Sequence, residues 1–340
     1  MTIKIKQFVL LKRPVGVPVE SNFSLKTETI SGDLKENELH LRGIYYSVDP
    51  YMRGRMNGAK SYVAPFALNE PISGAVIARV VESKKSGLIT GDFVFGQLPW
   101  ATEMVVDSSS VRKIDVQIGK ASDYLGVLGM TGLTAYFGLL KIGQPISGET
   151  VVVSGAAGAV GTIVGQIAKM KGCKVIGIVG SGEKEKLLKD RFHFDGMINY
   201  KSKDDLVHLI KNACPNGVDV YFDNVGGEIS DAVIQNMNFQ GRIVLCGQIS
   251  LYNSKEIPMG PRIQPILLTK SILMQGFIVS NFTEQFPEGL AELSKWVKEG
   301  KIEAIETIIE GFENLPKAFI DLFSGKNVGK MMVMAKDIAL

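Results

Sequence analysis

Residues 151–171 read VVVSGAAGAVGTIVGQIAKMK, and this stretch decides the fold of the middle of the chain. Its run of valines predicts a parallel strand that is buried on both faces. Glycines follow at Gly155, Gly158 and Gly161, and apolar residues then recur at helical spacing. A strand, a glycine turn and a helix are the setting of a dinucleotide-binding turn, in which the helix N-terminus faces a pyrophosphate.

The glycine turn has two interpretations. The usual pattern G-x-G-x-x-G would require glycine where Ala156 stands, so an ordinary tight turn is the alternative. In the cofactor-binding interpretation, Gly158 lets the backbone approach the pyrophosphate and Gly161 lets the helix pack closely on the strand. The predicted cofactor-binding residues of the turn are Gly155, Ala157, Gly158, Ala159, Val160 and Gly161.

The end of the next predicted strand, residues 174–179, favours NADP(H) over NAD(H). An NAD site usually offers an acidic residue there, which binds the ribose 2′-hydroxyl. Here the strand ends in Gly-Ser-Gly at 180–182, which leaves room for a 2′-phosphate, and Lys184 can supply positive charge. Tyr200 can lie beside the adenine ribose. The alternative is that Lys184 is one of several solvated lysines on a helix over 183–190.

Length and composition describe a globular protein with about two domains. The chain has 340 residues, and its 38 basic and 35 acidic residues give a net charge of +3. That balance does not favour a nucleic-acid or anionic-membrane partner. Lysines interrupt the apolar residues at the N-terminus, and no apolar run reaches the roughly 18 residues of a membrane span. We therefore expect a cytoplasmic protein.

Cysteine and histidine spacing argues against a disulfide framework and against a zinc site. The three cysteines and three histidines stand far apart, with no paired spacing. Cys246 ends a predicted strand at 242–246 and is either a small core residue or a contact of the cofactor. Asp223 and Asn224 follow a predicted strand at 218–222, at the sheet edge where ligands bind. Each is either a ligand contact or a helix N-cap.

The first 123 residues differ in pattern from the middle of the chain. Short β-rich runs alternate there with turns, which predicts a partly antiparallel β domain. From 124 to 294, strands alternate with helices, which predicts a doubly wound parallel sheet. An outer strand at 328–334 returns to the first domain. The predicted fold class is α/β, with a Rossmann domain (124–294) inserted in a β-rich domain made of 1–123 and 295–340.

Several segments together resemble the medium-chain dehydrogenase/reductase superfamily, and in particular its zinc-independent branch of leukotriene B4 dehydrogenases, prostaglandin reductases and curcumin-type double-bond reductases. They occur in the expected order over most of the chain. The segments are SVDPYMRGRM (47–56), GMTGLTAYFGLL (129–140), SGAAGAVGTIVGQIAK (154–169), NYK (199–201), YFDNVGG (221–227), GRIVLCGQISLYN (241–253) and GKNVGK (325–330).

The resemblance implies a GroES-like β domain and NADPH-dependent reduction of the carbon–carbon double bond of α,β-unsaturated ketones or aldehydes. Hydride then goes to the β-carbon, and hydrogen bonds stabilise the enolate. It implies no metal, since SVDPYMRG and PISGAVIA stand without Cys or His where zinc-dependent members have their ligands.

Tyr252 matches a family tyrosine of the active site and is predicted to position the substrate or donate a hydrogen bond. Tyr51 either lines the cleft or belongs to the β-domain core. Further predicted cofactor contacts are Met130, Thr131, Gly247 and Asn327.

The resemblance also implies a homodimer. The apolar run 271–279 predicts an edge strand suited to such an interface. Residues 253–265 are polar and interrupted by Pro and Gly, which predicts a mobile lid. Two alternative functions stay open: a quinone reductase of the same superfamily, and an NADPH-binding protein without turnover.

Overall fold

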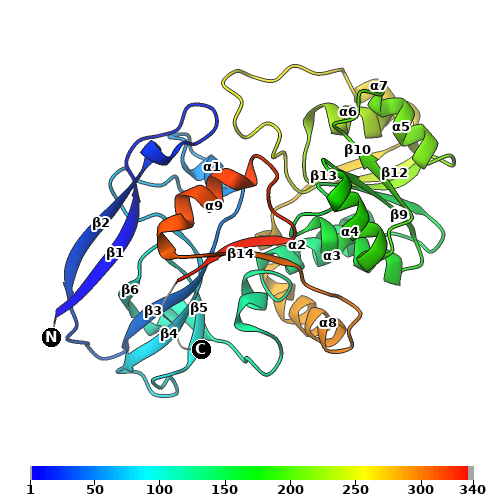
Figure 1. Ribbon diagram of the computed structural model, residues 1–340. Helices are drawn as coiled ribbons and strands as arrows, with labels where there is room; N and C mark the ends of the chain where they lie inside the picture. The colour runs from blue at the N-terminus through cyan, green and yellow to red at the C-terminus, as the bar shows by residue number, and fades with distance from the viewer. Residues whose placement is uncertain (1, 336–340) are drawn as a thin grey trace. The chain divides into compact units, whose positions relative to one another are not determined.

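The structure is a computed structural model that describes residues 2–335, and its contacts divide the chain into two units. The β-rich unit comprises Met1–Leu125, Glu306–Asn327 and Met331–Leu340. The parallel-sheet unit comprises Gly126–Ile305 and Val328–Lys330. Figure 1 shows both units, with labels on many of their helices and strands.

The β-rich unit contains a two-stranded and a seven-stranded sheet. Strands β1 and β2 pair antiparallel, and the larger sheet has the order β14-β15-β3-β4-β5-β7, with β6 on β3. Two helices, α1 and α9, complete the unit. The bounds are β1 Thr2–Leu10, β2 Phe23–Ser31, β3 Glu38–Ser47, α1 Met52–Arg55, β4 Ser73–Ser83, β5 Phe93–Pro99, β6 Glu103–Asp107, β7 Val111–Lys113, β14 Glu306–Glu310, α9 Leu315–Leu322 and β15 Lys330–Met334.

The C-terminal strand is found where the sequence predicts it, but it is not an outer strand. Strand β15 pairs antiparallel with β3, and β14 lies on its other side. Because both edges are paired, the side chains from Lys330 to Val333 are buried. The alternation with lysine therefore gave the wrong position for this strand within the sheet.

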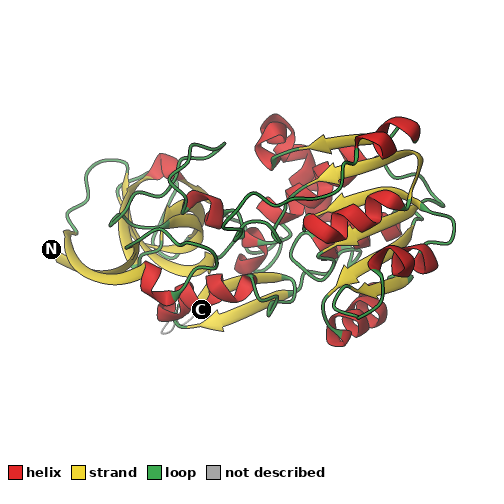
Figure 2. Cartoon of the chain, turned by 90° about the horizontal axis from the view of Figure 1, so that it is seen from above, coloured by secondary structure: helices red, strands yellow, loops and turns green. Residues whose placement is uncertain are grey.

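The parallel-sheet unit has six parallel strands in the order β10-β9-β8-β11-β12-β13. This is the predicted doubly wound sheet, and Figure 2 shows the helices along its strands. The bounds are α2 Met130–Phe137, β8 Thr150–Ser154, α3 Gly161–Met170, β9 Lys174–Val179, α4 Gly182–Phe192, β10 Gly196–Asn199, α5 Leu206–Ala213, β11 Val218–Asp223, α6 Gly227–Gln235, β12 Met237–Leu245, α7 Gln264–Thr269, β13 Leu273–Gly276 and α8 Phe286–Lys298.

The predicted edge strand 271–279 is shorter than expected. Only Leu273–Gly276 forms β13, and a 3-10 helix begins at Val279. Phe277 instead turns inward, where its ring meets that of Phe282, and Phe282 stacks on Phe137 with ring centroids 4.8 Å apart. Aromatic packing against α2 therefore ends the strand. The predicted lid segment also ends early, because α7 begins at Gln264.

Candidate cofactor and active site

The glycine turn lies between β8 and α3 and is tightly folded. Gly155 has φ +60°, which favours glycine, and the Gly158 N–H donates to the Gly155 carbonyl at 2.9 Å. A Cβ on Gly161 would lie 2.4 Å from that same carbonyl oxygen and 2.7 Å from the Ala156 Cα. The helix can therefore start directly on the turn only because residue 161 is glycine.

The outer side of this turn fits a pyrophosphate. A Cβ on Gly158 would meet only the Gly155 oxygen, at 3.1 Å, so the space beyond it is open. Helix α3 has no side-chain cap at its N-terminus. Within residues 2–335, the N–H group of Val160 donates to no other protein group. Uncapped N–H groups at the positive end of a helix form an anion-binding site.

A short segment from the far end of the chain fixes the inner side of the turn. The Gly329 N–H donates to the Ala157 carbonyl at 2.8 Å, and Gly329 also forms a parallel bridge with Gly158. Gly329 has φ +62°, and a Cβ there would lie 2.0 Å from the Ile305 carbonyl oxygen. Sequence reasoning missed this role of Gly329, although the GKNVGK segment contains it. Asn327 directly precedes this segment and belongs to the β-rich unit.

At the end of β9, small residues make room for the ring of Tyr200. A Cβ on Gly180 would lie 2.9 Å from the Tyr200 ring and hydroxyl. Ser181 caps α4 by accepting the Lys184 N–H, so the Lys184 side chain leaves the first turn of the helix beside this edge. Burial, and next the charge of Lys201, lower the pKa of Lys184. Two lysines that repel each other form a basic pair suited to a 2′-phosphate. The sequence analysis did not single out Lys201.

Asn224 is tied to the strand next to its own. Its side-chain Nδ2 donates to the Ser154 carbonyl at 2.8 Å, and its N–H donates to the Ser154 hydroxyl at 2.9 Å. Ser154 is the residue before the glycine turn, so these bonds place Asn224 beside that turn. No side-chain cap hydrogen bond is made at the start of α6, which disfavours the N-cap alternative for Asn224.

Tyr252 is half-buried in the loop after β12. Its hydroxyl accepts the Gln248 N–H at 3.3 Å, which leaves its own proton available to a ligand. A Cβ on Gly247 would lie 3.3 Å from this hydroxyl and from the Asn224 carbonyl, so Gly247 separates the two. Burial raises the pKa of Tyr252 above its ordinary value. The side chain is therefore a neutral hydrogen-bond donor.

Cys246 directly follows β12, and Met130 and Thr131 begin α2. Burial, and next the charge of Asp223, raise the pKa of the Cys246 thiol to about 12, so this side chain is a neutral thiol. The Thr131 hydroxyl donates to the Gly126 carbonyl at 3.0 Å and is buried. Met130, one residue earlier, is partly exposed at the N-terminus of α2.

Tyr51 lies in the β-rich unit, just before α1. It is partly buried and packs against the hydrophobic core of that unit. Burial raises its pKa well above the ordinary value. Tyr46, near the end of β3, is fully buried and donates to the Ala101 carbonyl at 2.8 Å. Tyr46 is therefore a core residue.

Comparison with known proteins identifies the family. Residues 6–114 match the model of an N-terminal domain of oxidoreductases, and residues 159–295 match the model of zinc-binding dehydrogenases. The chain is 54% identical to YfmJ of Bacillus subtilis over 339 residues, 99% of each chain. The chain belongs to the medium-chain dehydrogenase/reductase family.

Two further members of this family are similar along nearly the whole chain. The NADPH-dependent curcumin reductase of Escherichia coli is 41% identical, over 96% of each chain. The crystal structure of CurA from Vibrio vulnificus in complex with NADPH superimposes with a TM-score of 0.91 at 42% identity, over 98% of this chain and 100% of that one.

Across residues 2–335, no group of three or more His, Cys, Asp or Glu side chains is arranged to hold a metal ion. In the same described part of the chain, every helix is too short or too polar to span a bilayer.

Proposed function

We propose that this protein uses NADPH to reduce the carbon–carbon double bond of α,β-unsaturated ketones and aldehydes. The observation that supports this most strongly is the full-length likeness to reductases of that kind. The curcumin reductase of Escherichia coli and the 2-alkenal reductase of Nicotiana tabacum are 41% and 42% identical to it.

The cofactor would be held along the carboxyl edge of the parallel sheet. The N-terminus of α3 at Val160, which has no side-chain cap, suits the pyrophosphate, with Ala159 beside it, and Gly158 leaves space for it. Lys184 and Tyr200 would bind the 2′-phosphate and the adenosine. The remaining proposed contacts are Met130, Thr131, Gly155, Ala157, Gly161, Asn224, Cys246, Gly247 and Asn327.

When bound, NADPH supplies the hydride that reaches the β-carbon of the substrate. Tyr252 would donate a hydrogen bond to the carbonyl oxygen, where negative charge develops as the enolate forms. The Gln248 N–H fixes the direction of the Tyr252 hydroxyl and increases its strength as a donor. Because its pKa is raised, Tyr252 stabilises the enolate without giving up its proton, and the α-carbon takes its proton from water. Tyr51 is proposed as a second tyrosine of the substrate site.

We propose that turnover needs no zinc, although one matching family model is that of zinc-binding dehydrogenases. The proposal is supported by the sequence, in which no Cys or His stands in SVDPYMRG or PISGAVIA. An enone accepts hydride at its β-carbon and needs only hydrogen bonds at its oxygen, so the Lewis acid of a carbonyl reductase is dispensable.

A homodimer and a cytoplasmic location are part of the proposal. Strand β13 is at the edge of its sheet, and Leu273 on it is 52% exposed. An exposed edge with apolar side chains favours pairing with a second copy. Sedimentation of a monomer at micromolar concentration would contradict the dimer. The three reduced cysteines and the small net charge are typical of a cytoplasmic enzyme with a small-molecule substrate.

The test is NADPH oxidation with a panel of aliphatic and aromatic enones, enals and quinones. We expect enones and enals to be turned over with loss of the double bond. A preference for quinones would favour the quinone-reductase alternative, and no oxidation with any substrate would favour a binding protein.

A further inference from the structure

Asp223, at the carboxyl end of β11, has no part in the proposed chemistry and yet is entirely buried. One of its carboxylate oxygens, Oδ1, accepts from the Ser154 hydroxyl at 2.9 Å and the Tyr221 hydroxyl at 2.8 Å. The same oxygen accepts from the N–H groups of Val225 at 3.0 Å and Gly226 at 2.9 Å. Within residues 2–335 the other oxygen, Oδ2, has no hydrogen-bond partner. Four donors therefore converge on one atom of a buried carboxylate.

The first link runs from Asp223 to the glycine turn. The Ser154 hydroxyl donates to Asp223 and at the same time accepts the Asn224 N–H at 2.9 Å. Since Gly155 follows Ser154 directly, the carboxylate fixes the place of Asn224 relative to the turn. The Ser154 hydroxyl therefore joins the Asp223 side chain to the main chain of Asn224.

The second link runs from Asp223 to the loop that contains Tyr252. The main-chain oxygen of Asp223 accepts from the N–H groups of Cys246 at 2.9 Å and Gly247 at 3.0 Å. Further along, Ser250 donates its N–H at 3.1 Å and its hydroxyl at 2.6 Å to the Val225 carbonyl. The conformation of residues 223–226 therefore sets the path of the loop up to Tyr252.

We infer that Asp223 is a positioning residue that fixes the positions of the glycine turn and the Tyr252 loop relative to each other. The inference rests on the proposed function in one respect, namely the role of Tyr252 in turnover. Without the carboxylate, the N–H groups of Val225 and Gly226 and two hydroxyls would lose their common acceptor inside the protein. Residues 223–226 would then change conformation, and both links would be lost together.

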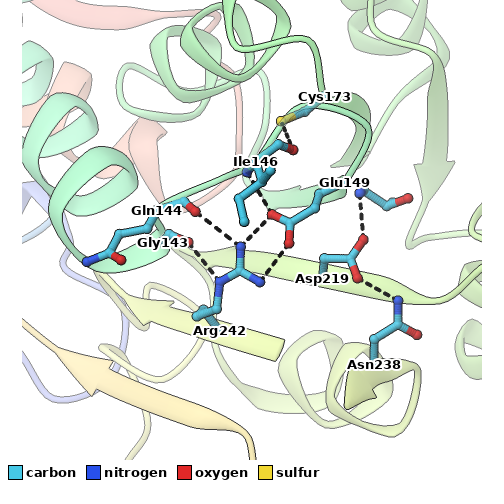
Figure 3. Close-up of polar contacts among 9 residues, drawn as sticks. Gly143, Gln144, Ile146, Glu149, Cys173, Asp219, Asn238 and Arg242 are labelled. Atoms are coloured by element: carbon cyan, nitrogen blue, oxygen red, sulfur yellow. Dashed lines mark hydrogen bonds and ion pairs between the residues drawn. The ribbon is translucent and has the colours of Figure 1, made fainter. Parts of the chain in front are cut away.

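The same strand offers a matched control at its opposite end. One oxygen of Asp219 accepts the Thr150 N–H at 2.8 Å. The other accepts the side-chain amide of Asn238 at 2.7 Å, and Figure 3 shows this bond. Asp219 thus ties β11 to β8 and β12, as Asp223 does, but at the amino ends of these strands. If Asp223 only stabilised the fold, replacing Asp223 or Asp219 would affect NADPH binding and kcat to the same extent.

The experiment compares Asp223→Ala, Asp223→Asn and Asp219→Ala, with NADPH affinity measured by fluorescence titration and kcat measured at saturating NADPH. Loss of a charge-assisted hydrogen bond is worth about tenfold or more in an equilibrium constant. We expect Asp223→Ala to raise the Kd of NADPH and to lower kcat, each by about tenfold or more. Asparagine keeps the Oδ1 acceptor, so Asp223→Asn should recover most of both. Asp219→Ala should lower the melting temperature and leave Kd and kcat within about threefold.

Equal effects of Asp223→Ala and Asp219→Ala on Kd and kcat would overturn the inference, and so would no effect of Asp223→Ala. If Asp223→Ala does not fold, Ser154→Ala decides the question. That variant removes the hydroxyl that joins Asp223 to the Asn224 N–H and keeps the bond from the Asn224 side chain to the carbonyl of residue 154. It should weaken NADPH binding several-fold, whereas an unchanged Kd would refute the link. Since the Kd needs no turnover, wild-type protein that binds NADPH but reduces no enone would count against the proposed function and not against this link.

Discussion

Replacing Lys184 with alanine should weaken the binding of NADPH and leave the binding of NADH nearly unchanged. Lys184 is partly buried in the first turn of α4, and Tyr200 packs on Gly180 at the same edge. A charge-assisted contact of this kind contributes about 1–3 kcal/mol. The Michaelis constant for NADPH should therefore rise by roughly 5- to 150-fold. Lys201 stays in the variant and keeps part of the attraction, so the lower half of this range is expected.

The assay is steady-state kinetics with each nucleotide at a fixed, saturating enone concentration. Lys186→Ala is the matched control, because Lys186 is an exposed lysine two residues further along the same helix. It should change neither Michaelis constant. An equal loss with NADPH and NADH in Lys184→Ala would mean that Lys184 supports the fold, and a wild-type preference for NADH would refute the assignment of the 2′-phosphate site.

Three further predictions concern packing, pH and metal. Gly161→Ala should lower the free energy of unfolding by about 1–3 kcal/mol, because the added Cβ would meet the Gly155 carbonyl. Gly182→Ala is the control and should leave the free energy of unfolding unchanged, because the space around Gly182 is open. Equal melting temperatures of the two variants would contradict this prediction. The raised pKa of Tyr252 keeps its phenol protonated past its ordinary pKa of about 10. The kcat should therefore be flat from neutral pH to about pH 9, and a fall in that range that disappears in Tyr252→Phe would be evidence against a neutral donor. Activity should survive exhaustive chelation, and one tightly held zinc per chain that is needed for turnover would disprove the metal-free mechanism.

Local pattern was sufficient to predict the strands and helices around the cofactor site. The run of valines predicts that strand β8 is buried. The prediction is confirmed, because β8 lies between two other strands and all five of its residues are buried. The turn at Gly155 and the start of α3 at Gly161 followed from the same stretch. The sequence analysis missed β2, Phe23–Ser31, because its polar and charged residues leave it mostly exposed and it is held by pairing with β1.

The contacts that organise the site depend on pairings between distant residues, which a local pattern cannot contain. Gly329 meets Ala157 across about half of the chain's length, and Ser154 meets Asp223 on a neighbouring strand. The roles of Gly329 and Lys201 were missed for this reason. The prediction of Asp223 as a ligand contact was wrong, because its side chain is buried and accepts hydrogen bonds from inside the protein. The end of β13 was misplaced because an apolar run alone does not distinguish strand pairing from the aromatic packing of Phe277 on Phe282.

The most direct test of the proposed reaction uses NADPH that bears deuterium at the transferred position of C4, with an aryl or alkyl enone as substrate. The position of the label in the product is then read by proton NMR and mass spectrometry. The account predicts a saturated ketone with deuterium on the former β-carbon and the carbonyl retained. Deuterium on the former carbonyl carbon, in an allylic alcohol that keeps its double bond, would contradict it.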